Sequence, residues 1–170
     1  LGFTYGVSID HLIFSGFPPE ERKRRWNLTL RNAEDFLRRH REKGCTFTPV
    51  GIAQGDSSEQ YAQAIRRLVE LEYTHLALGG LARSNDQAIR KVLQAVSPEL
   101  PAGTELHLFG VARLSLVPDF LRYGITSADS AAPLRRAFLG NSSDNYWTQD
   151  GCRYAAIRVP APTRTFFSTQ

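Results

Sequence analysis

Polar or glycine residues stand directly after short apolar runs at several places in this sequence, where a ligand site could form. They include Asp10, Gln54 and the pair Gly79-Gly80. A carboxylate accepts hydrogen bonds from N–H groups, a glutamine amide both donates and accepts, and paired glycines let the backbone approach a flat ligand closely. Together these groups suit the edge of a guanine-like ring, where a carbonyl acceptor stands beside an N1–H and a 2-amino donor.

Asp129 and several arginines could support a reaction at such a site. Asp129 would be free to act as a nucleophile or as an electrostatic stabiliser. Arg113 and Arg135 could hold a phosphate, because a guanidinium group binds phosphate through two parallel hydrogen bonds. These residues predict a site for a guanine-like base with a phosphate nearby.

Each of these assignments has a structural alternative that the sequence leaves open. An aspartate at the end of a strand is often the N-cap of the following helix, which applies to Asp10 and to Asp129. Gln54 could cap a turn, and Gly79-Gly80 could form only a tight loop between a strand and a helix.

The histidines and cysteines form no recognisable metal or hydrolase motif. The four histidines are scattered, and His107 stands inside an apolar strand, where we expect a hydrogen-bonded core histidine. Neither Cys-x-x-Cys, His-Glu-x-x-His nor Gly-x-Ser-x-Gly occurs, which argues against the common zinc, metalloprotease and serine-hydrolase sites.

The composition is that of a globular protein. Of 170 residues, 42% are hydrophobic and 22% are charged, which excludes general disorder. No apolar run is long enough to span a bilayer, so no membrane partner is expected. Cys45 and Cys152 form no disulfide framework, and a reducing cytoplasm is the default compartment. The chain lacks methionine and begins within a predicted strand, so we expect a fragment of a longer protein.

The net charge of +4 comes from 21 Lys+Arg against 17 Asp+Glu, with the densest basic cluster in the segment 20–41. Such a cluster could form a nucleic-acid face. It could equally be a solvated helix face with its own acidic partners, namely Glu34, Asp35 and Glu42. The sequence does not decide between these two interpretations.

Apolar periodicity predicts an alternation of strands and helices. The first helix begins at Pro18-Pro19-Glu20-Glu21, because proline and acidic residues suit a helix N-terminus, and it ends at Gly44. The predicted strands are 3–9, 47–53, 74–78, 105–111 and 154–159. The predicted helices are 18–43, 58–71, 85–96 and 116–123, with a helical turn at 133–139 and a loop at 140–151.

This alternation fits either a doubly wound sheet or part of a (β/α)8 barrel. Polar and glycine residues follow many consecutive strands, as in a barrel, and no Gly-x-Gly-x-x-Gly occurs. We therefore predict an α/β fold that is the C-terminal portion of a (β/α)8 TIM barrel. Residues 1–139 would form this partial barrel, with its N-terminal units missing. Residues 140–170 would form a loop, a strand and a tail leading to a C-terminal extension.

Four segments resemble motifs of the tRNA-guanine transglycosylase family, in the same order and at similar spacing. The family motifs are G-I-x-Q-G, (I/V)-G-G-L-(A/S), M-G-V-G and G-(V/I)-D-M-F-D-C-V-x-P-T-R-x-A. The matching segments are Gly51-Ile52-Ala53-Gln54-Gly55, Leu78-Gly79-Gly80-Leu81-Ala82, Phe109-Gly110-Val111-Ala112 and Gly124-Ile125-Thr126-Ser127-Ala128-Asp129-Ser130-Ala131-Ala132-Pro133-Leu134-Arg135-Arg136-Ala137. Each motif alone is weak, but four in order are specific.

The resemblance implies a role for each site residue. Asp129 matches the aspartate that attacks the ribosyl C1′ and forms a covalent glycosyl-enzyme intermediate. Asp10 matches the aspartate that binds the base through its N1–H and amino group. Gln54 and the Gly80 N–H match the groups that contact the base carbonyl, with Leu81 beside the 7-substituent.

The sequence also departs from the tRNA enzymes. Only Cys152 stands near the cysteines and histidine that bind zinc in the family, so the chain alone implies no cofactor and zinc is left open for a full-length protein. The family's Met-Phe before the nucleophile is Ser127-Ala128 here, and an insertion at 141–147 is unlike the tRNA enzymes. The D-S-G-G-F-Q motif of the family's general acid/base is absent, which predicts that this group lies upstream of Leu1.

These departures favour the branch that inserts 7-deazaguanine bases into DNA, the DpdA-type DNA transglycosylases of bacteria and their phages. The resemblance then implies an enzyme, a glycosyltransferase that exchanges guanine in nucleic acid, DNA rather than tRNA, for a 7-deazaguanine such as preQ0. Arg113, Arg135 and Arg136 could hold backbone phosphates. Related enzymes often dimerise, which leaves a homodimer open. The alternatives are a tRNA-guanine transglycosylase, a non-catalytic partner subunit of one, and an unrelated phosphate-binding barrel enzyme.

Overall fold

The computed structural model describes residues 2–132, 146–147 and 153–154. The chain divides into two compact units, residues 1–129 and 130–170. In the second unit, β6 (Tyr146–Trp147) pairs antiparallel with β7 (Arg153–Tyr154), and β6 falls within the segment predicted as a loop. The predicted helical turn at 133–139 lies outside the described residues, as does the predicted strand at 154–159 beyond its first residue.

The first unit is built on one parallel sheet whose strands lie side by side in chain order, from β1 to β5. The strands are β1 (Tyr5–Val7), β2 (Thr48–Ala53), β3 (His75–Leu78), β4 (Glu105–Leu108) and β5 (Ser127–Ala128). Because neighbouring strands are parallel, the residues that follow all five strands come out at the same edge of the sheet.

Helical segments connect the strands. The helices are α1 (Pro19–Glu42), α2 (Ser58–Glu70), α3 (Asp86–Val96) and α4 (Val117–Arg122), with single 3-10 turns at Leu81–Arg83, Ser97–Glu99 and Leu114–Leu116. Ser57 caps α2 and Asn85 caps α3, each accepting a backbone N–H of the first turn. These caps place the start of each helix directly beside the strand-end edge of the sheet.

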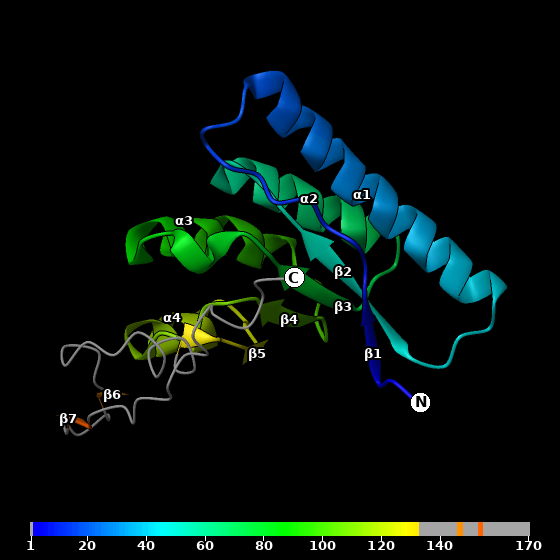
Figure 1. The fold of residues 1–170 in the computed structure, drawn as a ribbon. Coiled ribbons are helices and arrows are strands. Elements are labelled where there is room, and N and C mark those ends of the chain that lie inside the picture. The colour runs from blue at the N-terminus through cyan, green and yellow to red at the C-terminus, as the bar shows by residue number, and fades with distance from the viewer. Residues whose placement is uncertain (1, 133–145, 148–152, 155–170) are drawn as a thin grey trace, which may run out of the picture. The chain divides into compact units, whose positions relative to one another are not determined.

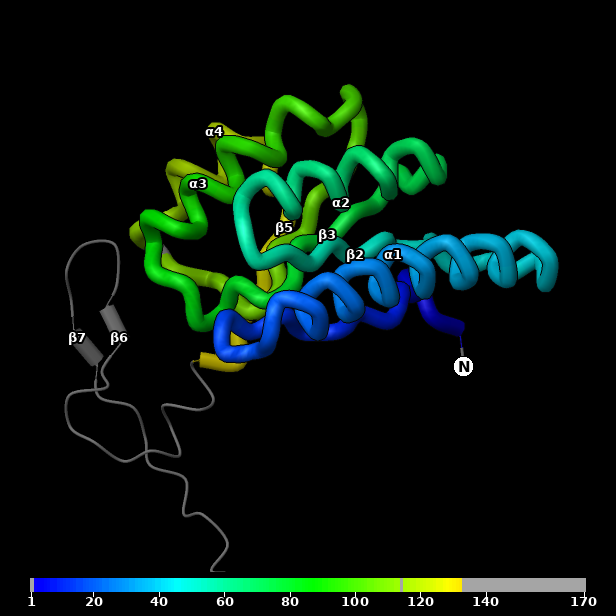
Figure 2. The backbone as a smooth tube through the Cα atoms, turned by 90° about the horizontal axis from the view of Figure 1, so that it is seen from above, coloured from blue at the N-terminus to red at the C-terminus, as the bar shows by residue number. Residues whose placement is uncertain are grey.

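The helices pack against one face of the sheet and leave the other face concave (Figures 1 and 2). The main core lies between helices and sheet and includes Leu76, Leu78, Leu106 and Leu108. Alternate residues of the strands face the concave side, where Val50, Ile52 and Ala77 form a second, smaller cluster with Phe109. Five parallel strands curled inside their helices form part of a (β/α) barrel, which confirms the predicted fold class.

The fifth strand is not where the sequence pattern placed it. β5 contains only Ser127 and Ala128, and polar residues surround it, so it carries no apolar run. The backbone forms it nonetheless, because the Thr126 N–H donates to the Leu106 carbonyl at 2.9 Å and Thr126 Oγ1 accepts the Leu106 N–H at 3.0 Å. Gly124, with φ of 78°, turns the chain from α4 into this strand.

Candidate active site

A cleft of about 1010 Å³ lies at the edge of the sheet where the parallel strands end. Its walls include residues that follow all five strands, among them Asp10, Gly55, Gly80, Gly110 and Asp129. We call it the strand-end cleft. Of the residues predicted to form a site, Asp10, Gly79, Gly80, Leu81 and Asp129 line this cleft, so the fold brings together positions that lie far apart in the sequence.

Asp10 is held at the cleft by two side chains of α1. The Asn32 amide donates to the carbonyl of Ile9 at 3.1 Å, and the backbone N–H of His11 donates to Thr29 Oγ1 at 2.9 Å. These bonds fix the backbone on both sides of Asp10 and leave its carboxylate free for other partners. Asp10 does not cap α1, because the N-cap is Pro18 and carries no side-chain cap bond.

Gln54 is almost fully buried, with 1% of its surface exposed, and it lies directly beneath Asp10. Its amide nitrogen donates to Asp10 Oδ2. Its amide oxygen has no hydrogen-bond partner among the described residues. The Gln54 side chain is therefore a buried amide that holds the Asp10 carboxylate, and it is not a turn cap.

Gly79 and Gly80 make room for the amide end of the Gln54 side chain. A Cβ atom on Gly79 would lie 2.4 Å from Gln54 Nε2, and one on Gly80 would lie 2.5 Å from Gln54 Oε1. Gly80 also has a φ of 80°, in the left-handed region that favours glycine. The two glycines thus form a tight loop that lines the cleft.

Tyr61 of α2 holds the peptide between these two glycines. Its buried hydroxyl donates to the Gly79 carbonyl at 2.7 Å. Because C=O and N–H point in opposite directions across a trans peptide, this bond directs the Gly80 N–H away from Tyr61. Burial raises the pKa of the Tyr61 hydroxyl, which keeps it protonated as a donor.

Asp129 lies just after β5, with 57% of its side chain exposed toward the cleft. The Gly110 N–H donates to Asp129 Oδ1 at 2.7 Å. His107 Nε2 stands 3.5 Å from the same oxygen, while His107 Nδ1 lies 2.8 Å from the Ser127 hydroxyl. His107 is hydrogen-bonded, as predicted, but it lies on the concave face beside Asp129 and not in the main core.

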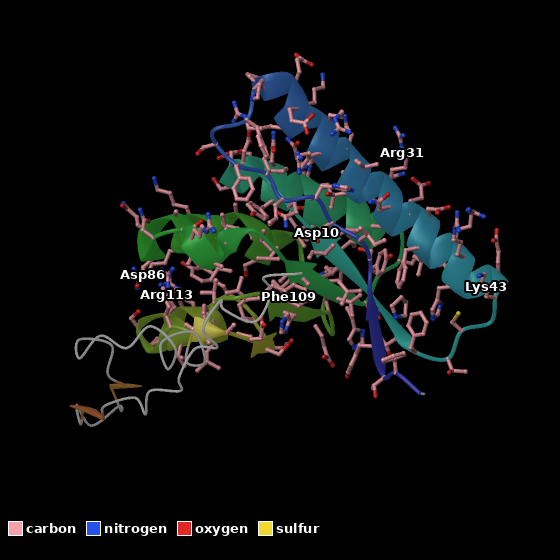
Figure 3. All side chains as sticks on the ribbon, viewed as in Figure 1. Asp10, Arg31, Lys43, Asp86, Phe109 and Arg113 are labelled. Atoms are coloured by element: carbon pink, nitrogen blue, oxygen red, sulfur yellow. The ribbon has the colours of Figure 1, made fainter. Side chains whose placement is uncertain are left out.

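Of the three arginines predicted to contact phosphate, the structure describes only Arg113. Arg113 does not line the cleft. Its guanidinium donates to Asp86 Oδ1 at 2.6 Å and to the Ser84 carbonyl at 2.7 Å. The first of these bonds lowers the pKa of Asp86. Figure 3 labels Asp86 and Arg113 near each other beside α3. Arg135 and Arg136 lie outside the described residues.

The basic cluster of α1 is largely neutralised by its own ion pairs. The paired arginines are Arg22 with Asp56, Arg24 and Arg25 with Glu21, Arg38 with Asp35 and Glu42, Arg39 with Asp35, and Arg41 with Glu72. The structure therefore favours a solvated helix face over a nucleic-acid face for this helix. Arg83 and Lys91 line the strand-end cleft instead, and within the described part of the chain neither forms an ion pair.

No group of three or more His, Cys, Asp or Glu residues is arranged to hold a metal ion in the part of the chain that the structure describes. Zinc in structural sites takes four such ligands, so these residues do not fit a zinc ion. Cys152, the single cysteine predicted near the family's zinc position, lies outside the described residues. None of the described helices is long and apolar enough to cross a membrane.

Sequence reasoning missed Tyr61, Arg83 and Lys91 as residues of the cleft, and His107 as a neighbour of Asp129. Tyr61 carried a weak signal, because a tyrosine in the apolar stripe of a helix needs a hydrogen-bond partner when it is buried. His107 carried none, since its nearness to Asp129 depends on the β4–β5 register, which pairs His107 with Ser127.

Comparisons with known proteins agree with this geometry. Residues 5–150 match the family model described as TGT, queuine tRNA-ribosyltransferase. The chain is 39% identical over 167 residues to a DNA-guanine transglycosylase from Salmonella montevideo, covering 93% of this chain and 39% of that protein. It is 30% identical over 125 residues to a queuine tRNA-ribosyltransferase from Nitrosospira multiformis, covering 71% of this chain and 34% of that protein. The same kind of protein from Rickettsia typhi is 29% identical over 168 residues, which cover 94% of this chain and 45% of that protein.

The chain thus spans less than half the length of each of these relatives. The match nevertheless runs through β1 to β5 and includes all four motif segments. Fold, motif order and sequence similarity agree: the chain belongs to the TGT family of queuine tRNA-ribosyltransferases.

Proposed function

We propose that this chain supplies the base site and the nucleophile of a base-exchange transglycosylase. The enzyme replaces guanine in nucleic acid, DNA in preference to tRNA, with a 7-deazaguanine such as preQ0. The observation that carries the proposal is that Asp10, Gly80 and Asp129 line one cleft at the ends of parallel strands. This is the place where barrel enzymes carry their catalytic groups.

The base site follows from the direction of its donors and acceptors. The Asp10 carboxylate accepts the N1–H and the 2-amino group of guanine, while Gln54 holds one of its oxygens in place. The Gly80 N–H, directed by the Tyr61–Gly79 hydrogen bond, donates to the base carbonyl. A 7-deazaguanine presents the same edge as guanine, so one site can hold both the leaving and the incoming base in turn.

The exchange consists of two displacements at C1′ of the target nucleotide. In the first, a bond forms between the Asp129 carboxylate and C1′ while the C1′–N9 bond breaks. The electron pair leaves on N9 of guanine, which takes up a proton. In the second, N9 of the deazaguanine attacks C1′, loses its proton and releases the carboxylate.

Arg83 and Lys91 are the cationic groups best placed to hold the nucleic-acid backbone. The target base must leave its stack to enter the cleft, so phosphates on either side come close to the rim. Both side chains line the cleft, whereas Arg113 and six of the α1 arginines are bound to carboxylates, and Arg31 of α1 does not line the cleft. We assign the flanking phosphate contacts to this pair.

The preference for DNA is supported by similarity and by the residues near the nucleophile. Identity is 39% to a protein named DNA-guanine transglycosylase, against 30% and 29% to two named queuine tRNA-ribosyltransferases. Ser127-Ala128 also replaces the Met-Phe of the tRNA enzymes immediately before Asp129.

The test is incubation of the full-length protein with preQ0 and either guanine-containing DNA or tRNA, followed by mass spectrometry of the digested nucleosides. We expect deazaguanine in DNA, and none with Asp129→Asn. Asp35→Asn, which removes an exposed carboxylate of α1, is the matched control and keeps activity. Deazaguanine in tRNA alone would overturn the DNA preference and keep the mechanism. Incorporation into neither would favour the non-catalytic partner subunit.

A further inference from the structure

His107 presents an unusual combination of burial and an unused donor beside the proposed nucleophile. Its Nε2 is buried and has no hydrogen-bond partner among the described residues. The same atom lies 3.5 Å from Asp129 Oδ1, slightly longer than a hydrogen bond. A closure of about 0.5 Å would form that bond, and such bonds often tighten only when substrate is present.

The imidazole ring is fixed on two sides. Its Nδ1 lies 2.8 Å from the Ser127 hydroxyl, and its ring packs edge-on against Phe109 with 4.4 Å between the centroids. If the serine donates to Nδ1, the ring proton sits on Nε2 and points at the carboxylate. The opposite tautomer would set a lone pair against the charged Asp129, so the neighbouring carboxylate selects the Nε2–H form.

We propose that His107 is a positioning residue that orients the Asp129 carboxylate for attack. Its Nε2–H and the Gly110 N–H both address Oδ1, at 3.5 and 2.7 Å. Within the described part of the chain, Oδ2 accepts no hydrogen bond and remains the more nucleophilic oxygen. The proposal rests on the proposed function, because it assigns which oxygen of Asp129 bonds to C1′.

The arrangement would act in both displacements. When Oδ2 bonds to C1′, Oδ1 becomes the carbonyl oxygen of the glycosyl ester. When the deazaguanine attacks, the carboxylate leaves and negative charge returns to Oδ1, where two N–H donors meet it. Donors already in place where charge develops are the usual source of such stabilisation.

The test compares three variants of His107 and its partner in the full-length protein. His107→Leu removes the donor, His107→Gln keeps an N–H at the reach of Nε2, and Ser127→Ala removes the hydroxyl that sets the tautomer. The readouts are the single-turnover rate of covalent adduct formation with guanine-containing DNA, the KM for the base, and the melting temperature.

His75 offers a matched control on the same concave face. It is half-buried like His107, with side chains 24% and 25% exposed, and its Nε2 lies 3.6 Å from the carboxylate of Glu105. His75 stands at the opposite end of its strand from the cleft and does not line it. His75→Leu therefore removes an equivalent histidine–carboxylate contact without touching Asp129.

We expect His107→Leu to slow adduct formation about 10- to 100-fold, because a reacting group displaced by about 1 Å from its attack geometry can lose up to about 100-fold in rate. The KM for the base should not change, His107→Gln should recover most of the rate, Ser127→Ala should fall between the two, and His75→Leu should react at the normal rate. A normal rate for His107→Leu, or a His107→Gln as slow as His107→Leu, would overturn the positioning role. Failure of the wild-type protein to form any Asp129-dependent adduct would instead reject the proposed function.

Discussion

The hydroxyl of Tyr61 donates a 2.7 Å hydrogen bond to the carbonyl of Gly79. Tyr61 lies on α2, and Gly79 directly follows β3, the next strand along the chain. This one contact links α2 to the wall of the strand-end cleft. It fixes the peptide whose other end is the Gly80 N–H, the proposed donor to the base carbonyl. The direction of that donor therefore depends on the Tyr61 hydroxyl, which is bonded to the Gly79 carbonyl.

Tyr61→Phe should weaken base binding. Without the hydroxyl, the Gly79–Gly80 peptide loses a hydrogen bond whose net contribution is about 1 kcal/mol, so the KM for the base should rise about fivefold. The matched control is Tyr73→Phe, since the Tyr73 hydroxyl donates to the Ala33 carbonyl at 2.7 Å, buried and away from the cleft. Both variants should lose similar stability in urea unfolding. An equal rise in KM for both would contradict a specific role for Tyr61.

Gly79→Ala should disrupt the base site while leaving the fold intact. Its Cβ would lie 2.4 Å from Gln54 Nε2 and 3.1 Å from Asp10 Oδ2, so both side chains must move. We expect a rise of at least about tenfold in the KM for the base, because the hydrogen-bonding edge is displaced. Gly16→Ala is the control, since no atom lies within 4 Å of its added Cβ. Isothermal titration with preQ0 would measure the loss directly, and unchanged affinity would reject the assignment of the base site.

Arg83→Ala and Lys91→Ala should each weaken DNA binding and flatten its dependence on salt. Each phosphate contact contributes about 0.7 to the slope of log K against log salt for a single strand and about 0.9 for duplex DNA. Arg38→Ala, on α1, removes an arginine that is already bound to Asp35 and Glu42. It should leave the slope unchanged in fluorescence anisotropy titrations. If Arg38→Ala reduced the salt dependence of DNA binding more than Arg83→Ala, the nucleic-acid interface would lie on α1 instead.

Acid should destabilise the first unit partly through Glu21. Hydrogen bonds from Arg24 and Arg25 lower the pKa of Glu21 from 4.5 to about 2. A lowered folded-state pKa gives stability that is complete above pH 4.5 and is lost as the pH falls toward 2. Urea midpoints measured at pH 6 and pH 3 should therefore differ less for Glu21→Gln than for the wild type. Glu20→Gln, its neighbour without an arginine partner among the described residues, should behave like the wild type.

Much of the fold was predictable because its elements are regular. Apolar periodicity and the Pro18-Pro19 helix start located α1, α2 and α3 to within a few residues. β5 was not predictable, because Ser127 and Ala128 form a strand only through backbone bonds to β4. Local sequence carries no signal for a strand that its neighbour imposes.

The family, the alternation of strands and helices as far as β4, and the residue types at the strand ends all follow from the order of the residues, because motif spacing and hydrophobic period are local properties. The folded structure places other residues around these strand ends. It places Gln54 under Asp10, Tyr61 behind Gly79 and His107 beside Asp129, and it binds Arg113 to Asp86 outside the cleft. Such contacts depend on strand register and helix packing, which bring together residues far apart along the chain. Local sequence patterns therefore do not predict them.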